Sequence, residues 1–223
     1  VVITDGGTDN DITLSASTGS ASISAASYGT TASSLVYTIS GATANNTSLT
    51  ITPTYATSGA GNITDASSNE MANGETVSGT DGAKPAILSA ATGDNNSDGT
   101  VDRLTLTFSE SVVITDGGTD NDITLSASTG SASISAASYG TTASSLVYTI
   151  SGATANNTSL TITPTYATAG AGNITDASSN EMKDGETVTG TDGAKPALVS
   201  ASYKDTETPI GNAQVNRIDA VFS

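Results

Sequence analysis

The sequence predicts an all-β protein built from tandem β-sandwich modules, and three observations support this prediction. First, residues 1–90 recur almost unchanged at residues 112–201, an offset of 111 residues. Second, apolar and polar residues alternate along many short segments, which is the period of a half-buried strand. Third, turn-forming pairs such as Thr18-Gly19 and Asn73-Gly74 separate these segments at short intervals. No segment shows a helical period of useful length.

Counted from Pro85, one full repeat contains about seven or eight expected strands. They lie at residues 86–91, 101–109, 111–115, 121–127, 131–137, 144–151, 159–166 and 186–190. The first opens after an X-Pro step, which favours extended backbone at a sheet edge. In the second, Leu104, Leu106 and Phe108 share one face, while Arg103 and Thr105 share the other. This alternation predicts one buried and one solvated face.

The later strands are justified by the same alternation, which is visible in the first copy. Ile12, Leu14 and Ala16 define one strand, and Ala21, Ile23 and Ala25 define the next. Leu35, Tyr37 and Ile39 follow, and then Leu49, Ile51, Pro53 and Tyr55. The β-branched Thr and Val residues between them suit a pleated strand. The outward faces are mostly Ser and Thr, as expected of surfaces in contact with water.

The two copies differ at only six positions. These are Ser58/Ala169, Ala72/Lys183, Asn73/Asp184, Ser78/Thr189, Ile87/Leu198 and Leu88/Val199. The Ala72/Lys183 and Asn73/Asp184 changes lie in a predicted loop, so the differences indicate no binding face on one strand surface. An enzyme seldom needs two nearly identical domains in tandem, whereas a protein whose role is length, valency or assembly does.

A recurring segment sets the domain boundaries. Thr80–Pro85 returns as Thr191–Pro196. On this frame we expect an incomplete module at 1–83 that lacks its first two strands, a complete module at 84–194, and the first two strands of the next module at 195–223. Either the chain is a window on a long covalent array, or the C-terminal strands of one copy complete the N-terminal module of another. The second arrangement is strand addition between subunits.

Composition and charge limit the possible partners. Only 35% of the residues are hydrophobic and 4% are aromatic, so each core is expected to be modest. The periodic apolar residues argue against disorder. A net charge of −16 excludes a nucleic-acid partner and disfavours anionic membranes. The charge suits calcium, and it also keeps like-charged modules apart in solution.

Several kinds of chemistry are excluded by missing residue types. The chain contains no cysteine and no histidine, which removes cysteine nucleophiles, Ser-His-Asp triads and zinc sites built from these residues. No apolar run reaches the length of about 18 residues that a membrane span needs. Because the chain begins at Val1 and shows no signal peptide, we expect it to be an internal part of a longer protein.

Three motifs together resemble bacterial Ig-like repeats of S-layer and large surface proteins. They are the Pro-led segment Lys84–Leu88, the strand ending Leu104–Val112 and the turn Gly172–Glu181. The family carries a TFSE.V second strand and a D.(S/A).N turn before its last strand. The resemblance covers the whole repeat, although Ser179 stands where many members have Gly. It implies Ig-like β-sandwich modules that serve as spacers or adhesive units in extracellular, cell-surface arrays, often stabilised by calcium.

One loop has the spacing of a calcium site. Residues 94–102 read D-N-N-S-D-G-T-V-D and match the start of an EF-hand-type loop. Its predicted ligands are Asp94, Asn96, Asp98, the carbonyl of Thr100, and Asp102. Thr105 stands where a bidentate Glu is expected, and the equivalent segment 204–214 lacks the pattern. The alternative is a hairpin loop rich in turn-forming Asn, Asp and Gly.

These observations predict a non-enzymatic structural repeat of a long extracellular protein, filament or S-layer. Neighbouring copies of the same module are its expected partners, with calcium as a stabilising ion. Strand complementation is one way to link them. The alternative function is an adhesin whose loops or Thr-rich strand faces bind carbohydrate, ice or another cell.

Overall fold

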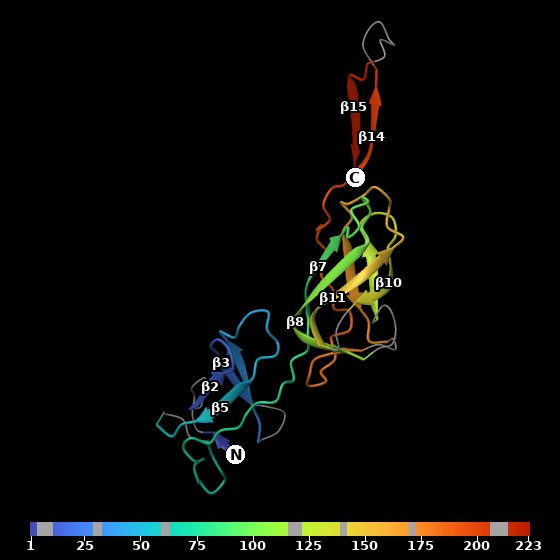
Figure 1. Cartoon of the computed structure of the whole chain (residues 1–223). Coiled ribbons are helices and arrows are strands. Elements are labelled where there is room, and N and C mark those ends of the chain that lie inside the picture. Colours follow the sequence, from blue (N-terminus) through green and yellow to red (C-terminus); the bar gives the residue numbers. More distant parts are fainter. Residues whose placement is uncertain are drawn as a thin grey trace. The chain divides into compact units, whose positions relative to one another are not determined.

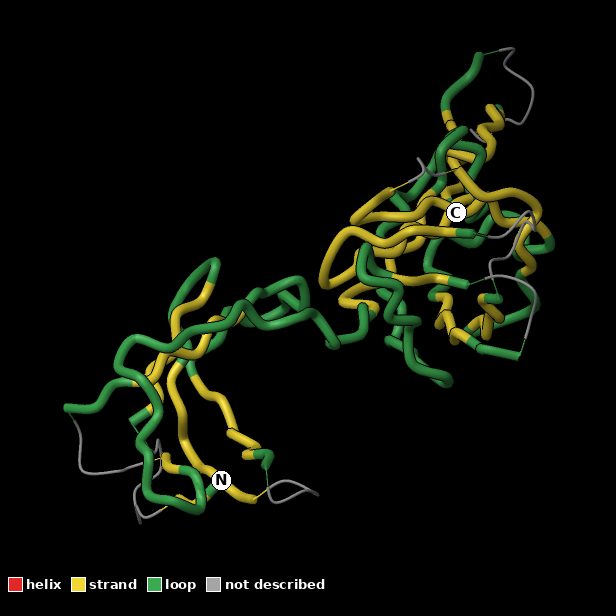
Figure 2. The backbone as a smooth tube through the Cα atoms, turned by 90° about the horizontal axis from the view of Figure 1, so that it is seen from below, coloured by secondary structure: helices red, strands yellow, loops and turns green. Residues whose placement is uncertain are grey.

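The structure is a computed structural model, and its regular secondary structure consists of strands. It describes residues 1–3, 11–28, 33–58, 63–115, 122–138, 142–169, 173–205 and 214–223, and no helix lies among them (Figure 2). The prediction of an all-β protein is therefore confirmed. The chain divides into two compact units, Val1–Ala83 and Lys84–Ser223, each of which is described by itself below.

The second unit contains strands β7 to β15. Their bounds are β7 (Ile87–Gly93), β8 (Arg103–Ile114), β9 (Ile123–Ala127), β10 (Ser133–Ser138), β11 (Thr142–Ser151), β12 (Ile162–Tyr166), β13 (Ile174–Thr175), β14 (Leu198–Lys204) and β15 (Arg217–Phe222). The larger sheet has the order β10-β11-β8-β13, and β7 also pairs with β8 (Figure 1). All of these pairs are antiparallel. The long strand β8 is therefore the centre of the sheet.

A smaller sheet supplies the other wall of the core. Strands β9 and β12 pair in register from Ile123↔Tyr166 to Ala127↔Ile162. An antiparallel bridge between Thr165 and Thr187 continues this layer. Side chains of both sheets form one buried cluster, giving a sandwich-like unit. The cluster includes Leu104, Leu106, Phe108, Val112, Ile123, Leu146, Tyr148, Ile150, Leu160, Ile162, Tyr166, Ile174 and Met182.

Strand β8 is longer than the sequence pattern indicates. The alternation predicts two strands at 101–109 and 111–115, but the structure has one strand from Arg103 to Ile114. Alternation fails locally because Phe108, Ser109 and Glu110 are all buried in succession. The register between β8 and β11 also shifts at this point. The short strand β13 is absent from the predicted set, since two residues cannot show a period.

The first unit contains strands β1 to β6 in three separate pairs. Their bounds are β1 (Val2–Ile3), β2 (Ile12–Ala16), β3 (Ser22–Tyr28), β4 (Leu35–Ser40), β5 (Ile51–Tyr55) and β6 (Ile63–Thr64). The pairs are β1-β6, β2-β5 and β3-β4. Registers repeat those of the second unit: Ile12↔Tyr55 in β2-β5 matches Ile123↔Tyr166 in β9-β12.

Identical residues differ in burial between the two units. Ile39 on β4 is 40% exposed, whereas its equivalent Ile150 on β11 is 5% exposed. Tyr148 is fully buried and its equivalent Tyr37 is only partly buried. The difference follows from β8, which covers one edge of β11. Among the described residues, β4 pairs only with β3.

This difference predicts unequal effects of the same substitution. Ile150→Ala is expected to lower the free energy of unfolding by about 2–5 kcal/mol, because it leaves a cavity in a closed core. Ile39→Ala is expected to cost about 0.5 kcal/mol, as at an exposed site. Urea denaturation of the chain at low micromolar concentration, followed by far-ultraviolet circular dichroism, measures both changes. Equal losses in the two variants would contradict the difference in burial.

Candidate functional site

The predicted cation loop connects β7 to β8 in the second unit. Backbone pairing holds its ends together, because Asp102 N donates to Gly93 O at 3.0 Å. Ser97 and Gly99 have positive φ angles of 60° and 87°, so the chain turns sharply at the position where the motif places glycine. A Cβ on Gly99 would also lie 2.9 Å from Ser223 Cβ and 3.1 Å from Val199 Cγ2. Glycine is therefore required here by conformation and by packing.

The side chains of this loop bind the loop's own backbone. Asp94 accepts hydrogen bonds from Gly99 N at 2.8 Å and Asp98 N at 3.3 Å. Asn96 Oδ1 accepts from Asp98 N, Asp98 Oδ1 accepts from Thr100 N, and Asp102 Oδ1 accepts from Asn95 N. The contacts of Asn96 and Asp98, each with the backbone N two residues further on, are those of Asx turns. Hydrogen bonding within the loop thus accounts for the same spacing that suggests a calcium site.

A cavity of about 640 Å³ lies beside this loop within the second unit. Its lining includes Gly93, Asp94, Ser97, Arg103, Gly193, Lys195, Pro196, Ala197 and Leu198. The Arg103 guanidinium lies over Gly93, where an added Cβ would be 2.9 Å from Arg103 Nε. The cavity therefore carries both signs of charge and lies where the C-terminal segment leaves the sandwich-like part of the unit.

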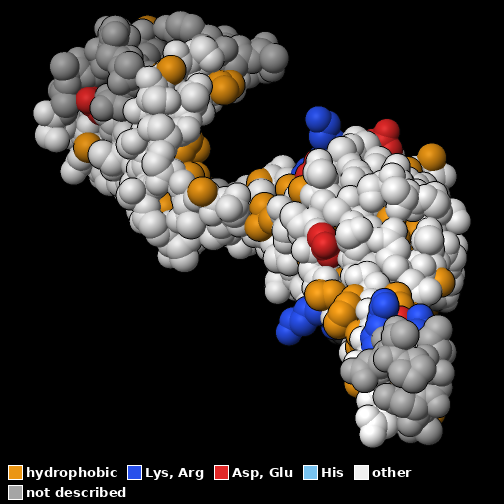
Figure 3. Space-filling model, turned by 90° about the horizontal axis from the view of Figure 1, so that it is seen from above, with side chains coloured by type: hydrophobic (Ala, Val, Ile, Leu, Met, Phe, Trp, Pro, Cys, Tyr) orange, Lys and Arg blue, Asp and Glu red, His pale blue; other side chains and the backbone are white. Residues whose placement is uncertain are grey.

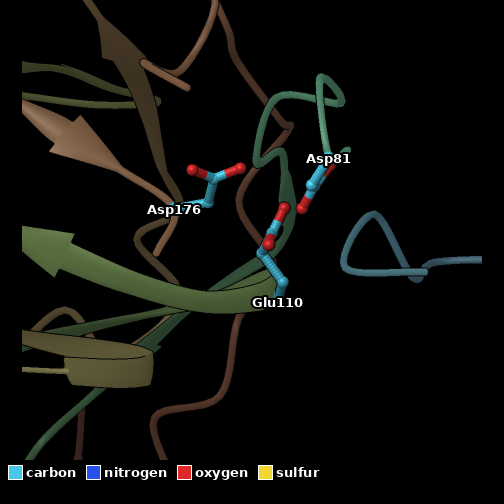
Figure 4. Close-up of side chains that lie close together, drawn as sticks. All are labelled: Asp81, Glu110 and Asp176. Atoms are coloured by element: carbon cyan, nitrogen blue, oxygen red, sulfur yellow. The ribbon is translucent and has the colours of Figure 1, made fainter. Parts of the chain in front are cut away.

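Two buried carboxylates form a second acidic feature of this unit. Oxygens of Glu110, on β8, and Asp176, directly after β13, lie within 4.8 Å of each other (Figure 4). Glu110 is 8% exposed and Asp176 is 2% exposed. Each of these two carboxylates can offer an oxygen ligand to the same cation. Asp81, also labelled in Figure 4, belongs to the first unit.

Asp176 also has a structural role in its turn. Its carboxylate accepts hydrogen bonds from Ser178 N at 2.8 Å, Asn180 N at 2.7 Å and Asn180 Nδ2 at 2.7 Å. Ser179 in this turn has a φ of 68°, which explains why a glycine is suited to its position. In the sequence, Glu110 and Asp176 belong to two separate motifs, at residues 104–112 and 172–181. The motifs are far apart in sequence, so no spacing could have placed the two carboxylates together.

A buried tyrosine joins three segments of the second unit. Tyr166 Oη donates to Glu181 Oε1 at 3.0 Å and accepts from Ile174 N at 3.3 Å. Burial, followed by Glu181, raises the pKa of Tyr166 to about 12. In the first unit, Tyr55 bonds Glu70 at 2.9 Å and Ile63 N at 3.3 Å. This contact is therefore built by both copies of the sequence.

The raised pKa of Tyr166 predicts loss of stability at alkaline pH. Above the ordinary tyrosine pKa of 10 the unfolded chain loses its phenol proton first, while the native phenol keeps it up to about pH 12. The stabilisation is complete below pH 10 and disappears as the pH rises to 12. Tyr166→Phe should flatten this decline and cost about 1–3 kcal/mol at pH 7, because Ile174 N loses its acceptor.

Urea denaturation between pH 7 and pH 12 measures this effect. Tyr203→Phe is the matched control for the loss of a phenol hydroxyl, because Tyr203 is 74% exposed. A Tyr166→Phe profile that superposes on the wild-type profile would show that this phenol does not govern the alkaline transition.

Calcium binding to the β7–β8 loop remains a prediction with a direct test. If Asp94, Asn96, Asp98, Thr100 and Asp102 bind the ion, millimolar CaCl₂ will raise the Tm of the chain. Asp98→Asn removes one carboxylate and should abolish the rise, whereas Asp205→Asn in the equivalent loop should retain it. Scanning calorimetry with and without a chelator measures the change. If the Tm does not change when calcium is added, the prediction is wrong and residues 94–102 form only a hydrogen-bonded turn.

Comparison with family models, with curated proteins and with solved structures finds no match to this chain. Among the described residues, no helix is long and apolar enough to cross a membrane.

Proposed function

We propose that this chain is a non-enzymatic structural part of a long extracellular surface protein or filament. It acts as a spacer or scaffold built from stacked β-sandwich modules, and its partners are neighbouring copies of the same module. One observation carries the proposal. Polar residues that are present in both copies form the same intramolecular hydrogen bonds in each copy. A repeated sequence whose polar groups support its own fold is suited to building length.

The repeated contacts are closely matched. Tyr55–Glu70 recurs as Tyr166–Glu181, with Oη to Oε1 distances of 2.9 and 3.0 Å. Asp65 accepts from Ser67 N and Asn69 N at 2.8 and 2.9 Å, as Asp176 does from Ser178 N and Asn180 N. The matching geometry shows that both copies build these local contacts in the same way, which supports the proposal of a repeated module.

Surface composition supports the same role. Most of the surface visible in Figure 3 comes from side chains that are neither charged nor hydrophobic, or from backbone. Thr side chains on strand faces donate hydrogen bonds across the strand pair: Thr13 Oγ1 to Thr54 O, and Thr124 Oγ1 to Thr165 O. With a net charge of −16, such modules repel one another and stay soluble at high local density.

The proposed function predicts that the protein lies on the outside of the cell. Antibodies raised against the chain should label intact, unpermeabilised source cells, at points along an extended appendage or layer. Immunogold electron microscopy measures this, with pre-immune serum as the control. Label that appears only after permeabilisation would contradict the proposal. Saturable binding of the soluble chain on a glycan array, lost on changing exposed Thr residues, would favour the adhesin instead.

A further inference from the structure

The second unit shows how the first two strands complete a module. Strand β8 pairs with β11 in the register Leu106↔Leu146 and Leu104↔Tyr148, and β7 pairs with the outer edge of β8. Leu104 and Leu106 are fully buried by this arrangement. The β7–β8 hairpin therefore supplies both an edge for β11 and one side of the core.

The C-terminal hairpin β14–β15 repeats the β7–β8 hairpin in detail. Its register, Tyr203↔Ile218 and Leu198↔Phe222, matches Thr92↔Leu104 and Ile87↔Phe108. Both hairpins carry a register shift at the same place, between Leu198 and Ser200 and between Ile87 and Ser89. The ends match as well: Ala197 N donates to Ser223 Oγ at 2.9 Å, as Ala86 N does to Ser109 Oγ.

The apolar side chains of this second hairpin lie in solvent. Val215, Ile218 and Phe222 are 62%, 72% and 65% exposed. Their equivalents Val101, Leu104 and Phe108 are buried in the core of the second unit. Exposed apolar side chains on a two-stranded hairpin mark a surface for association. The β14–β15 hairpin thus already has the strand register that the β7–β8 hairpin has when packed on the core of the second unit.

The first unit presents the complementary surface. Strand β4 has the sequence of the C-terminal part of β11, residues 146–151, and pairs with β3 as β11 pairs with β10, with the same register shift. Within the described residues, no strand lies against the other edge of β4. Ile39 on this strand is 40% exposed, whereas its equivalent Ile150 on β11 is 5% exposed. In the part of the chain that the structure describes, no strand takes the place on β4 that β8 takes on β11.

We propose that the β14–β15 hairpin of one copy docks on β4 of a second copy and completes its first unit. This inference rests on the proposed scaffold function and specifies how modules of separate chains join. By analogy with β8–β11, the register pairs Leu35 with Ala220, Tyr37 with Ile218, and Thr38 with Arg217. The interface is head-to-tail, because the hairpin of one copy meets β4 of another, so the same contact can repeat from copy to copy.

The chemistry of the hairpin fits this docking. Ile218 and Phe222 replace Leu104 and Phe108 with side chains of similar size, whereas Ala220 stands where β8 has Leu106 and fills less of the core. Asp219 takes the place of Thr105, whose side chain is on the solvent-facing side of β8. Lys204 and Arg217 each bond Asp219 at 2.6 Å, and they lower the pKa of this carboxyl. The charged face of the hairpin therefore points away from the predicted core.

Paired cysteines test the register, since the chain has no native cysteine. Thr38→Cys with Arg217→Cys should, on mild oxidation, give disulfide-linked dimers and a ladder of higher species on a non-reducing gel. Thr149→Cys with Arg217→Cys is the matched control, because Thr149 is the same position on β11 and already faces Arg103 of β8. The control should stay monomeric under the same conditions.

Two results of this experiment would overturn the proposal. One is a Thr38/Arg217 product of monomer size only, whether it is unlinked or closed by an internal disulfide. The other is an equal ladder from both variants, which would indicate random collision. Either result leaves the scaffold function standing, because a covalent array needs no pairing between chains.

A second measurement needs no cysteine. Analytical ultracentrifugation of the unmodified chain should show association that rises with concentration, and Ile218→Asp should weaken it at least tenfold. Because Ile218 is exposed, the circular dichroism spectrum should not change. A chain that stays monomeric at all concentrations, or an Ile218→Asp variant that associates like the wild type, would refute the docking.

Discussion

The pairing of β8 with β11 is the interaction on which the rest of the second unit depends. Strand β8 contacts β7, β11 and β13, and it places four apolar side chains in the core: Leu104, Leu106, Phe108 and Val112. The same strand carries Glu110 toward Asp176. Without β8 there is no larger sheet and no wall opposite β9 and β12. Its pairing is long-range in sequence, so local propensity alone cannot produce it.

The first unit shows which properties survive without such a strand. Hairpin registers, the Tyr55–Glu70 bond and the Asp65 turn are all retained, because each is made by residues close to one another in the fold of one copy. Burial is not retained, and among its described hydrophobic residues only Tyr55 is fully buried. Local hydrogen bonding thus determines the geometry of the strand pairs and turns. Packing of β8 is needed for these elements to enclose a hydrophobic core.

The sequence predicted the strands whose alternation is regular, and it predicted less where burial breaks the period. Leu146, Tyr148 and Ile150 are buried on β11 as their pattern indicates. Ser109 and Glu110 are polar yet buried, so the alternation ends there and predicts two strands where the structure has one. For the loop at 94–102, oxygen ligands and turn-forming residues are the same residue types, so spacing cannot distinguish a cation site from hydrogen-bonded Asx turns.

The matching hairpins also bear on how such a protein changes over generations. Deleting residues 84–194 joins Ala83 to Lys195 and restores the segment Thr-Asp-Gly-Ala-Lys-Pro, because it occurs at both boundaries. The hairpin that follows has the same register and the same bulge as the one removed. Recombination between near-identical coding repeats can therefore lengthen or shorten the protein by whole units, and each new junction reuses strand pairing that already works.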